Sequence, residues 1–84
     1  LLNQNVPNPF IGNTSISYHL PGMVKSAEIV ITDKQGKNLK RVQINGTGNG
    51  KVEINTAALS PGTYQYTLYV NGSMVDSKQM VVSK

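Results

Sequence analysis

The C-terminal stretch of the chain, residues 63–84 (TYQYTLYVNGSMVDSKQMVVSK), limits the possible folds more than any other part. Its first half alternates apolar and polar residues with the two-residue period of a half-buried β-strand. Asn71-Gly72 follows, a dipeptide that tolerates the positive φ angles of a tight hairpin turn. We therefore predict a β-hairpin whose first strand directs four side chains into the core: Tyr64, Tyr66, Leu68 and Val70.

The returning strand, residues 73–82, changes phase along its length. A two-residue turn places Tyr66 opposite Ser77. In that register the side chains of the apolar residues Met80 and Val82 would point away from the core. One extra residue in a strand shifts this parity and returns such side chains to the core. We therefore expect a β-bulge near Lys78–Gln79.

Shorter alternating runs, separated by turn residues, occupy the rest of the chain. The predicted strands cover residues 1–6, 14–20, 27–31, 38–44 and 52–54, with Val30 as an outward-facing apolar exception. Leu39 is out of phase with the apolar residues that follow it, which indicates a second bulge near Lys40–Arg41. Short strands, frequent turns and no convincing helix are typical of a β-sandwich. We predict an all-β chain, a small Ig-like β-sandwich of about seven antiparallel strands.

The glycines are expected to serve in two kinds of segment, tight turns and one mobile loop. Gly36, Gly62 and Gly72 each close a turn that a Cβ would crowd, so we expect positive φ angles there. The glycine-rich stretch 45–50 is expected to be the most mobile segment and to tolerate alanine. Residues 56–59 are expected to form one helical turn.

Charge and composition argue against several classes of function. Eight Lys and Arg residues against four Asp and Glu give a formal net charge of +4. These basic residues are spread along the chain without interleaved aromatic residues, so we expect no nucleic-acid partner. No apolar stretch reaches the roughly 18 residues of a membrane span, so no membrane insertion is expected.

The chain also offers little material for catalysis or cofactor binding. It has no Cys, a single histidine (His19) and four acidic residues, none at the spacing of a metal site or an acid–base pair. We expect His19 to be exposed and without a chemical role, Asp33 to form a turn, and Asp76 to lie near Lys78. The sequence therefore predicts a protein that is not an enzyme, with no catalytic, cofactor or metal site.

Several motifs in sequence order carry a resemblance to a known family. The opening, Leu2-x-Gln4-Asn5-x-Pro7-Asn8-Pro9-Phe10 followed by Thr14-x-Ile16-x-Tyr18-x-Leu20-Pro21, resembles that of the C-terminal sorting domain of the type IX secretion system. The stretch Ile29-x-Ile31-x-Asp33-x-x-Gly36-Lys37 is similar to the central hairpin of that family. Leu59-x-x-Gly62-x-Tyr64-x-Tyr66-x-Leu68 and the ending Lys78-x-Met80-Val81-Val82, with the basic Lys84, resemble its last two motifs. The lysine pair common before Met in the family is Lys78-Gln79 here.

This resemblance implies a fold, a route and partners. Such domains are Ig-like and end larger cargo proteins of Bacteroidota, which reach the cell surface or the medium through the periplasm and outer membrane. We therefore expect residues 1–84 to be a single sorting domain cut from a larger secreted protein, with cargo domains N-terminal to it. The implied partners are the outer-membrane translocon, its shuttle proteins and a sortase-like cysteine peptidase that removes the domain at or before Leu1.

The resemblance also implies which residues are recognised by the translocon: Pro7, Asn8, Pro9, Phe10, Gly62, Tyr64, Lys78, Met80, Val82 and Lys84. A receptor can add a strand to the edge of a sheet, so the last strand and its terminus are the expected signal. The fold is expected to survive loss of the final few residues. Lys78 and Lys84 can alternatively protect a sheet edge from aggregation.

Two other functions stay open for an Ig-like domain. An adhesive or carbohydrate-binding module would use an exposed aromatic such as Tyr69 to stack on sugar rings. A structural spacer or capping domain of a surface protein would need no such residue.

Overall fold

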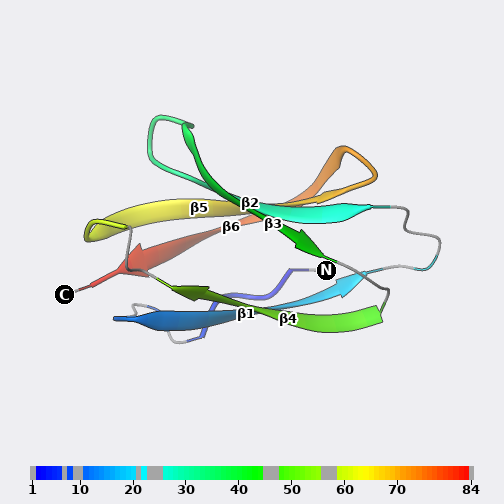
Figure 1. Ribbon diagram of the computed structural model, residues 1–84, viewed down its shortest axis with the longest axis horizontal. Helices are drawn as coiled ribbons and strands as arrows, with labels where there is room; N and C mark the ends of the chain where they lie inside the picture. Colours follow the sequence, from blue (N-terminus) through cyan, green and yellow to red (C-terminus); the bar gives the residue numbers. More distant parts are fainter. Residues whose placement is uncertain are drawn as a thin grey trace.

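The chain folds into six β-strands. The structure, a computed structural model, describes residues 2–6, 8, 11–20, 22, 26–44, 48–55 and 59–83. The strands are β1 (Asn13–Leu20), β2 (Ala27–Thr32), β3 (Asn38–Ile44), β4 (Gly48–Asn55), β5 (Gly62–Val70) and β6 (Ser73–Val82), and the described residues contain no helix (Figure 1).

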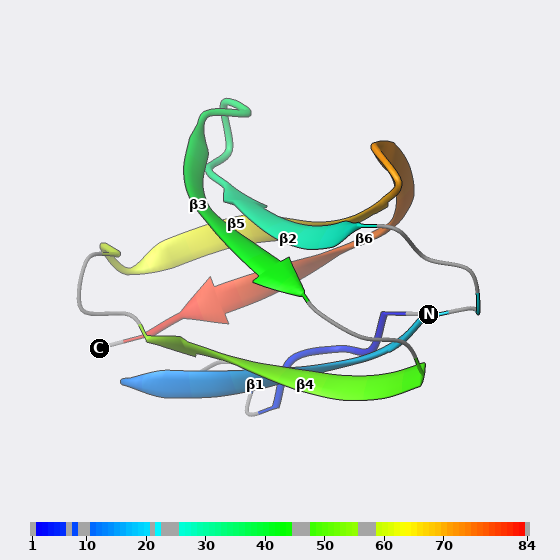
Figure 2. The ribbon, with the colours of Figure 1, turned by 45° about the vertical axis from the view of Figure 1, so that its right-hand side comes forward.

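The strands form two antiparallel sheets that lie one above the other. The larger sheet has the order β3-β2-β5-β6, and the smaller sheet pairs β1 with β4 (Figure 2). The N-terminal residues add a rudimentary seventh strand, because Leu2 bridges Tyr18 and Val6 bridges Ser15 beside β1. This arrangement confirms the predicted all-β sandwich.

Alternation fills the space between the sheets. Ile16 and Ile54 from the small sheet and Ile29 and Leu68 from the large sheet are fully buried in one cluster. Burial of an aliphatic side chain of this size contributes about 1.5–3 kcal/mol relative to exposure. Tyr64, predicted as a core residue, is only half-buried and packs against the cluster from its margin.

Val30 faces outward, as its parity predicts, and yet only 3% of its surface is exposed. Its strand β2 lies in the middle of the large sheet, where Arg41 on one side and Thr67 on the other are its cross-strand neighbours. A central strand therefore buries an apolar side chain on both faces of the sheet.

The hairpin β5–β6 contains the predicted bulge at a different place. Val70 pairs with Ser73, and the register shifts between Leu68 and Tyr69, so that Val75 is the extra residue. The expected position near Lys78–Gln79 was wrong. The expected pairing of Tyr66 with Ser77 was also wrong, because a bulge beside the turn places Tyr66 opposite Lys78.

The second bulge also lies slightly away from its predicted position. Ile31 pairs with Lys40 and Thr32 with Asn38, so Leu39, rather than Lys40 or Arg41, is the extra residue. The extra residue of a bulge has no partner on the neighbouring strand, and β3 is an edge strand. Leu39 is accordingly 39% exposed.

The glycine-rich stretch is more ordered than predicted where the structure describes it. Gly48 and Gly50 belong to β4, and Gly50 pairs with Tyr18 across the small sheet. A Cβ at Gly50 would overlap the Tyr18 ring, and Gly48 has a φ of +81°. The expected tolerance of alanine was therefore wrong at both positions. Residues 45–47 and 56–58 lie outside the described residues.

The predicted turn glycines have positive φ angles: Gly36 at 86°, Gly62 at 152° and Gly72 at 83°. Asp33 closes its turn as predicted, because its carboxylate Oδ1 accepts hydrogen bonds from the backbone N–H groups of Gln35 and Lys37, both at 2.9 Å.

Candidate functional site: the outer edge of β6

Strand β6 is the last strand of the large sheet, so one of its edges pairs with β5 and the other has no neighbouring strand within the described part of the chain. Backbone groups of successive residues in a strand alternate between the two edges. The carbonyl of Gln79 and the N–H of Val81 take partners outside the sheet. We call the backbone groups of Ser77, Gln79 and Val81 that face away from β5 the outer edge.

The structure brings six of the ten predicted recognition residues together around this half of β6. Gly62 pairs with Val82, Tyr64 pairs with Met80, and Asn8 contacts the next residue, Val81. Lys78 is half-buried on the same strand. The other four, Pro7, Pro9, Phe10 and Lys84, lie outside the described residues.

Met80 and Val82 face the core rather than the solvent. Met80 is 0% exposed and Val82 is 2% exposed. In the folded domain these side chains anchor β6 in the core, so they position the outer edge and are not themselves accessible at the surface.

The N-terminal residues lie along this edge. We call residues 2–6 together with Asn8 the strap. The Asn8 side-chain oxygen Oδ1 accepts a hydrogen bond from the Val81 N–H at 2.9 Å. Gln4 Nε2 donates to the Gln79 carbonyl at 2.6 Å and also to Asn5 Oδ1 at 2.8 Å. Two carboxamide side chains therefore cap two backbone groups of the outer edge.

A third contact joins the strap to β6 nearer the hairpin turn. Asp76 Oδ2 accepts a hydrogen bond from the Leu2 backbone N–H at 3.3 Å, and its Oδ1 accepts one from the Ser77 N–H at 2.8 Å. The Ser77 N–H is on the outer edge, so this group too is capped by a side chain. Lys78, the expected neighbour of Asp76, lies two residues after it on the same face of β6 and pairs with Tyr66.

Tyr66, a core residue, anchors the strap through its hydroxyl group. Its hydroxyl donates to the Asn3 carbonyl and accepts from the Asn5 N–H, both at 2.8 Å. Asn5 is only 1% exposed, and its Nδ2 donates to Thr14 Oγ1 at 3.0 Å. Burial raises the pKa of the Tyr66 hydroxyl, the hydrogen bond from Asn5 opposes this, and the nearby Asp76 carboxylate adds to the increase.

Gln4, Asp76 and the Tyr66 hydroxyl are the parts of this site that sequence reasoning missed. Their partners are 61 to 75 residues away along the chain. A side-chain cap on a distant strand leaves no local periodicity, although Gln4 lies inside the opening motif.

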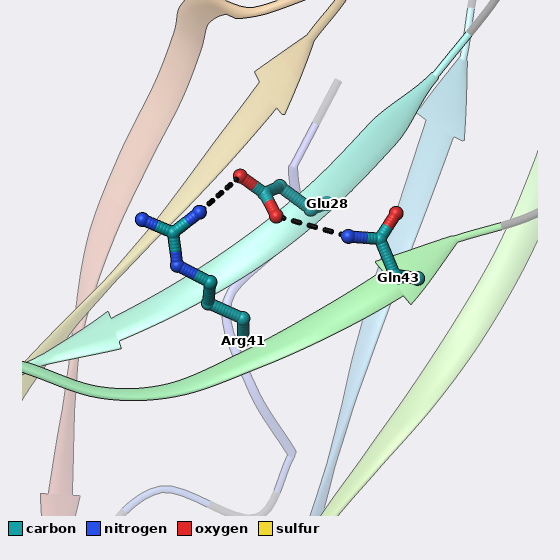
Figure 3. Close-up of polar contacts among 3 residues, drawn as sticks. All are labelled: Glu28, Arg41 and Gln43. Atoms are coloured by element: carbon teal, nitrogen blue, oxygen red, sulfur yellow. Dashed lines mark hydrogen bonds and ion pairs between the residues drawn. The ribbon is translucent and has the colours of Figure 1, made fainter.

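Two further groups of polar contacts lie away from this edge. On the outer face of the large sheet, Glu28 accepts from Arg41 and from Gln43, each at 3.2 Å (Figure 3). This ion pair neutralises the charge of Arg41, which follows Lys37 and Lys40 closely in the sequence. On the small sheet, the exposed His19 contacts Asn49, with 2.7 Å between Nδ1 and Oδ1.

The described residues offer neither a metal site nor a membrane-spanning helix. No group of three or more His, Asp or Glu in this part of the chain could hold a metal ion. Nor does this part contain a helix of the length and apolarity that crossing a membrane requires.

The two sheets and their shared core place the chain in the class of small Ig-like β-sandwich domains. Residues 6–83 match the family described as the secretion system C-terminal sorting domain. The match covers nearly the whole chain, so the chain belongs to this family. No curated protein matches it.

Membership of the family defines a function in general terms. The domain is a C-terminal sorting signal of the type IX secretion system, which exports proteins of Bacteroidota across the outer membrane. It interacts with that machinery and belongs to a secreted or cell-surface protein. The family consists of sorting signals and not of catalytic domains.

Proposed function

We propose that the type IX machinery reads this domain at the outer edge of β6 and at the residues that follow it, up to Lys84. The observation that supports this proposal is the gathering of the family motifs there: Asn8, Gly62, Tyr64 and Met80 all lie on or beside the C-terminal half of β6. Strand addition to such an edge gives affinity through backbone hydrogen bonds. The partner in this proposal is an extended segment of the translocon or of a shuttle protein.

The rest of the export route is part of the same proposal. Residues 1–84 form one sorting domain, and cargo domains precede it in the full-length protein. A sortase-like cysteine peptidase removes the domain at or before Leu1 once the cargo has crossed. The family match supports this route.

The ten recognition residues divide by role in this proposal. Met80 and Val82, which are buried, set the position of β6, together with Gly62 and Tyr64 opposite them. Lys78 contributes its charge at the end of a half-buried side chain, and Lys84 contributes a second charge two residues after Val82 in the sequence. Asn8 caps the Val81 N–H at the edge and is not itself a contact of the partner, and Pro7, Pro9 and Phe10 lie beside it in sequence.

The proposal is tested by removing one backbone donor from the outer edge. The substitution Val81→Pro deletes the N–H that faces away from β5, and proline is tolerated on edge strands where that N–H faces outward. A fusion of residues 1–84 to a periplasmic reporter is expressed in a host with this secretion system. We expect the reporter at the cell surface for the unchanged fusion and in the periplasm for Val81→Pro.

Val81→Ala is the matched control, because it shortens the same side chain and keeps the N–H. Thermal unfolding of each purified domain shows that the variants are folded. Deleting the last five residues is a poor test, because it would remove two buried side chains, Met80 and Val82. Equal surface display of Val81→Pro and Val81→Ala would contradict recognition at this edge.

A different function is expected if the unchanged fusion also stays in the periplasm. An adhesive or carbohydrate-binding module would then be favoured, with Tyr69 as its aromatic residue. Tyr69 is half-buried on the outer face of the large sheet, with Glu28 and Met74 as cross-strand neighbours. Among the described residues it is the only aromatic on that face, which is a small platform for a sugar.

A further inference from the structure

The outer edge of β6 is already occupied. Gln4 Nε2 donates to the Gln79 carbonyl at 2.6 Å, and Asn8 Oδ1 accepts from the Val81 N–H at 2.9 Å. A strand that adds to β6 would need these same two backbone groups. An N–H group makes one good hydrogen bond, so the Asn8 side chain and an incoming carbonyl compete for Val81.

The strap combines exposed contacts at the edge with buried contacts behind it. The caps from Gln4 and Asn8 are solvent-exposed. The hydrogen bonds of Asn5 to Tyr66 and to Thr14 are buried. The exposed Asn8 side chain can rotate away from the edge without disturbing a buried group, whereas rotation of Gln4 also releases its bond to Asn5 Oδ1. The buried bonds of Asn5 to Tyr66 and Thr14 do not involve either cap, so the caps can open while the strap stays attached to the core.

We propose that Gln4 and Asn8 form a displaceable guard over the recognition edge of β6. The guard closes the edge to unspecific strand pairing while the domain is free, and sheet edges without such protection promote aggregation. An extended segment of the secretion machinery displaces both side chains and takes their places at Gln79 and Val81. The choice of the secretion machinery as the occupant rests on the proposed function. The guard itself is a property of the isolated domain.

Amide hydrogen exchange of the purified domain tests the guard. In Asn8→Ala the Val81 N–H loses its acceptor, and we expect its exchange to accelerate about five- to tenfold, the factor that one net hydrogen bond represents. Asn49→Ala is the matched control. Asn49 is an exposed residue of the small sheet, away from β6, and its side chain contacts His19 of the same sheet. The amide of Leu68 in β5 reports any general loss of stability and should exchange equally in all three proteins.

The secretion assay tests the displacement. The double variant Gln4→Ala/Asn8→Ala opens the edge in advance, so its reporter fusion should reach the surface at least as fast as the unchanged fusion in a pulse–chase experiment. Gln35→Ala/Asn49→Ala is the control for the loss of two exposed amides. If the double variant stays in the periplasm while folded, the caps are part of the surface that is recognised, and displacement is wrong.

The two experiments separate the proposals from each other. Unchanged exchange at Val81 in Asn8→Ala would overturn the guard, whatever the secretion result. Accelerated exchange together with periplasmic retention of every fusion, including the unchanged one, would support the guard and contradict the proposed function. Concentration-dependent dimers of the double variant, measured by sedimentation, would identify a second copy as an occupant of the opened edge and support the protective role of the guard.

Discussion

Tyr66 joins the core of the domain to the strap through a single hydroxyl. The ring is fully buried opposite Lys78, and the hydroxyl makes two hydrogen bonds, with the carbonyl of Asn3 and the N–H of Asn5. A buried polar group of this kind stabilises a fold only when its hydrogen bonds are made. Tyr66 is therefore a packing residue and a positioning residue for the N-terminal segment.

The substitution Tyr66→Phe should lower the free energy of unfolding by about 1–3 kcal/mol, because it removes the hydroxyl while the backbone groups of Asn3 and Asn5 stay in place. Tyr69→Phe, on the outer face of the same strand, is the matched control and should change stability by less than about 0.5 kcal/mol. Urea unfolding followed by circular dichroism measures both. An equal effect of the two substitutions would contradict the anchoring role of the Tyr66 hydroxyl.

The same hydroxyl should make stability depend on pH in the alkaline range. Burial raises the pKa of Tyr66 in the folded state above its ordinary value of about 10. Between these two values the unfolded chain loses a proton that the folded domain keeps, so stability falls as pH rises. Thermal unfolding should show the stability difference between the unchanged domain and Tyr66→Phe shrinking above about pH 10. A difference that stays constant would show that the folded domain ionises as readily as the unfolded chain.

The sequence predicts the burial of Tyr66 but not the partners of its hydroxyl. Alternation within a strand is a local property, and it assigns each side chain to the inner or outer face. The partners of the hydroxyl, Asn3 and Asn5, lie 63 and 61 residues earlier in the chain. Hydrogen bonds between polar residues so far apart leave no periodic signal.

In the β5–β6 hairpin, the alternation of apolar and polar residues predicts that a bulge exists but not where it lies. The phase change before Met80 and Val82 requires one extra residue between the turn and Met80. Any residue in that interval satisfies the requirement, so the sequence predicts that a bulge exists and leaves its position open. In the structure the extra residue is Val75, 39% exposed, beside the turn.

The turn of this hairpin requires positive φ at both central residues. Asn71 has a φ of 51° and Gly72 a φ of 83°, as in the turns that suit the twist of paired strands. Gly72→Ala should therefore cost about 1 kcal/mol or more, even though a Cβ there would meet no neighbouring atom. The melting temperature measures this effect.

Gly22 provides the control for this prediction. It also has open space around it, but its φ is not positive. Gly22→Ala should be neutral or stabilise the domain by up to about 1 kcal/mol, because alanine restricts the unfolded chain. Equal effects at Gly22 and Gly72 would mean that backbone conformation does not decide the outcome.

At the scale of the whole molecule, the strap joins the two sheets along one side. It bridges β1 through Leu2 and Val6, and its side chains cap the edge of β6. The sequence predicts residues 1–6 as an edge strand and the two sheets as a sandwich, both from alternation and turn residues. It does not predict that the strap lies between β1 and β6, because strand order depends on packing between segments distant in the chain.

The recognition residues differ in how well the sequence could predict their roles. The family ending predicts Met80 and Val82 as recognition residues, whereas their alternation after a bulge predicts that both are buried. The structure buries both. Sequence resemblance identifies residues on which a family depends, and it does not separate those that contact a partner from those that hold the contacting strand.

The shared core predicts that the two sheets unfold together. Ile16 of β1 is fully buried in the same cluster as Leu68 of β5, and a two-stranded sheet such as β1–β4 is marginal by itself. Ile16→Ala should therefore lower the free energy of unfolding by about 2–5 kcal/mol, through lost burial and the cavity left behind. The loss should appear equally in the slowest-exchanging amides of both sheets.

Ser17→Ala, on the outer parity of the same strand, is the control and should leave stability within about 0.5 kcal/mol of the unchanged domain. Native-state hydrogen exchange distinguishes cooperative from local unfolding, because each amide reports the opening that exposes it. If Ile16→Ala accelerates exchange in β1 and β4 and leaves Leu68 unchanged, the large sheet is stable without the small one. The hairpin β5–β6 could then keep its fold, and with it the recognition edge, after the strap and the small sheet have opened.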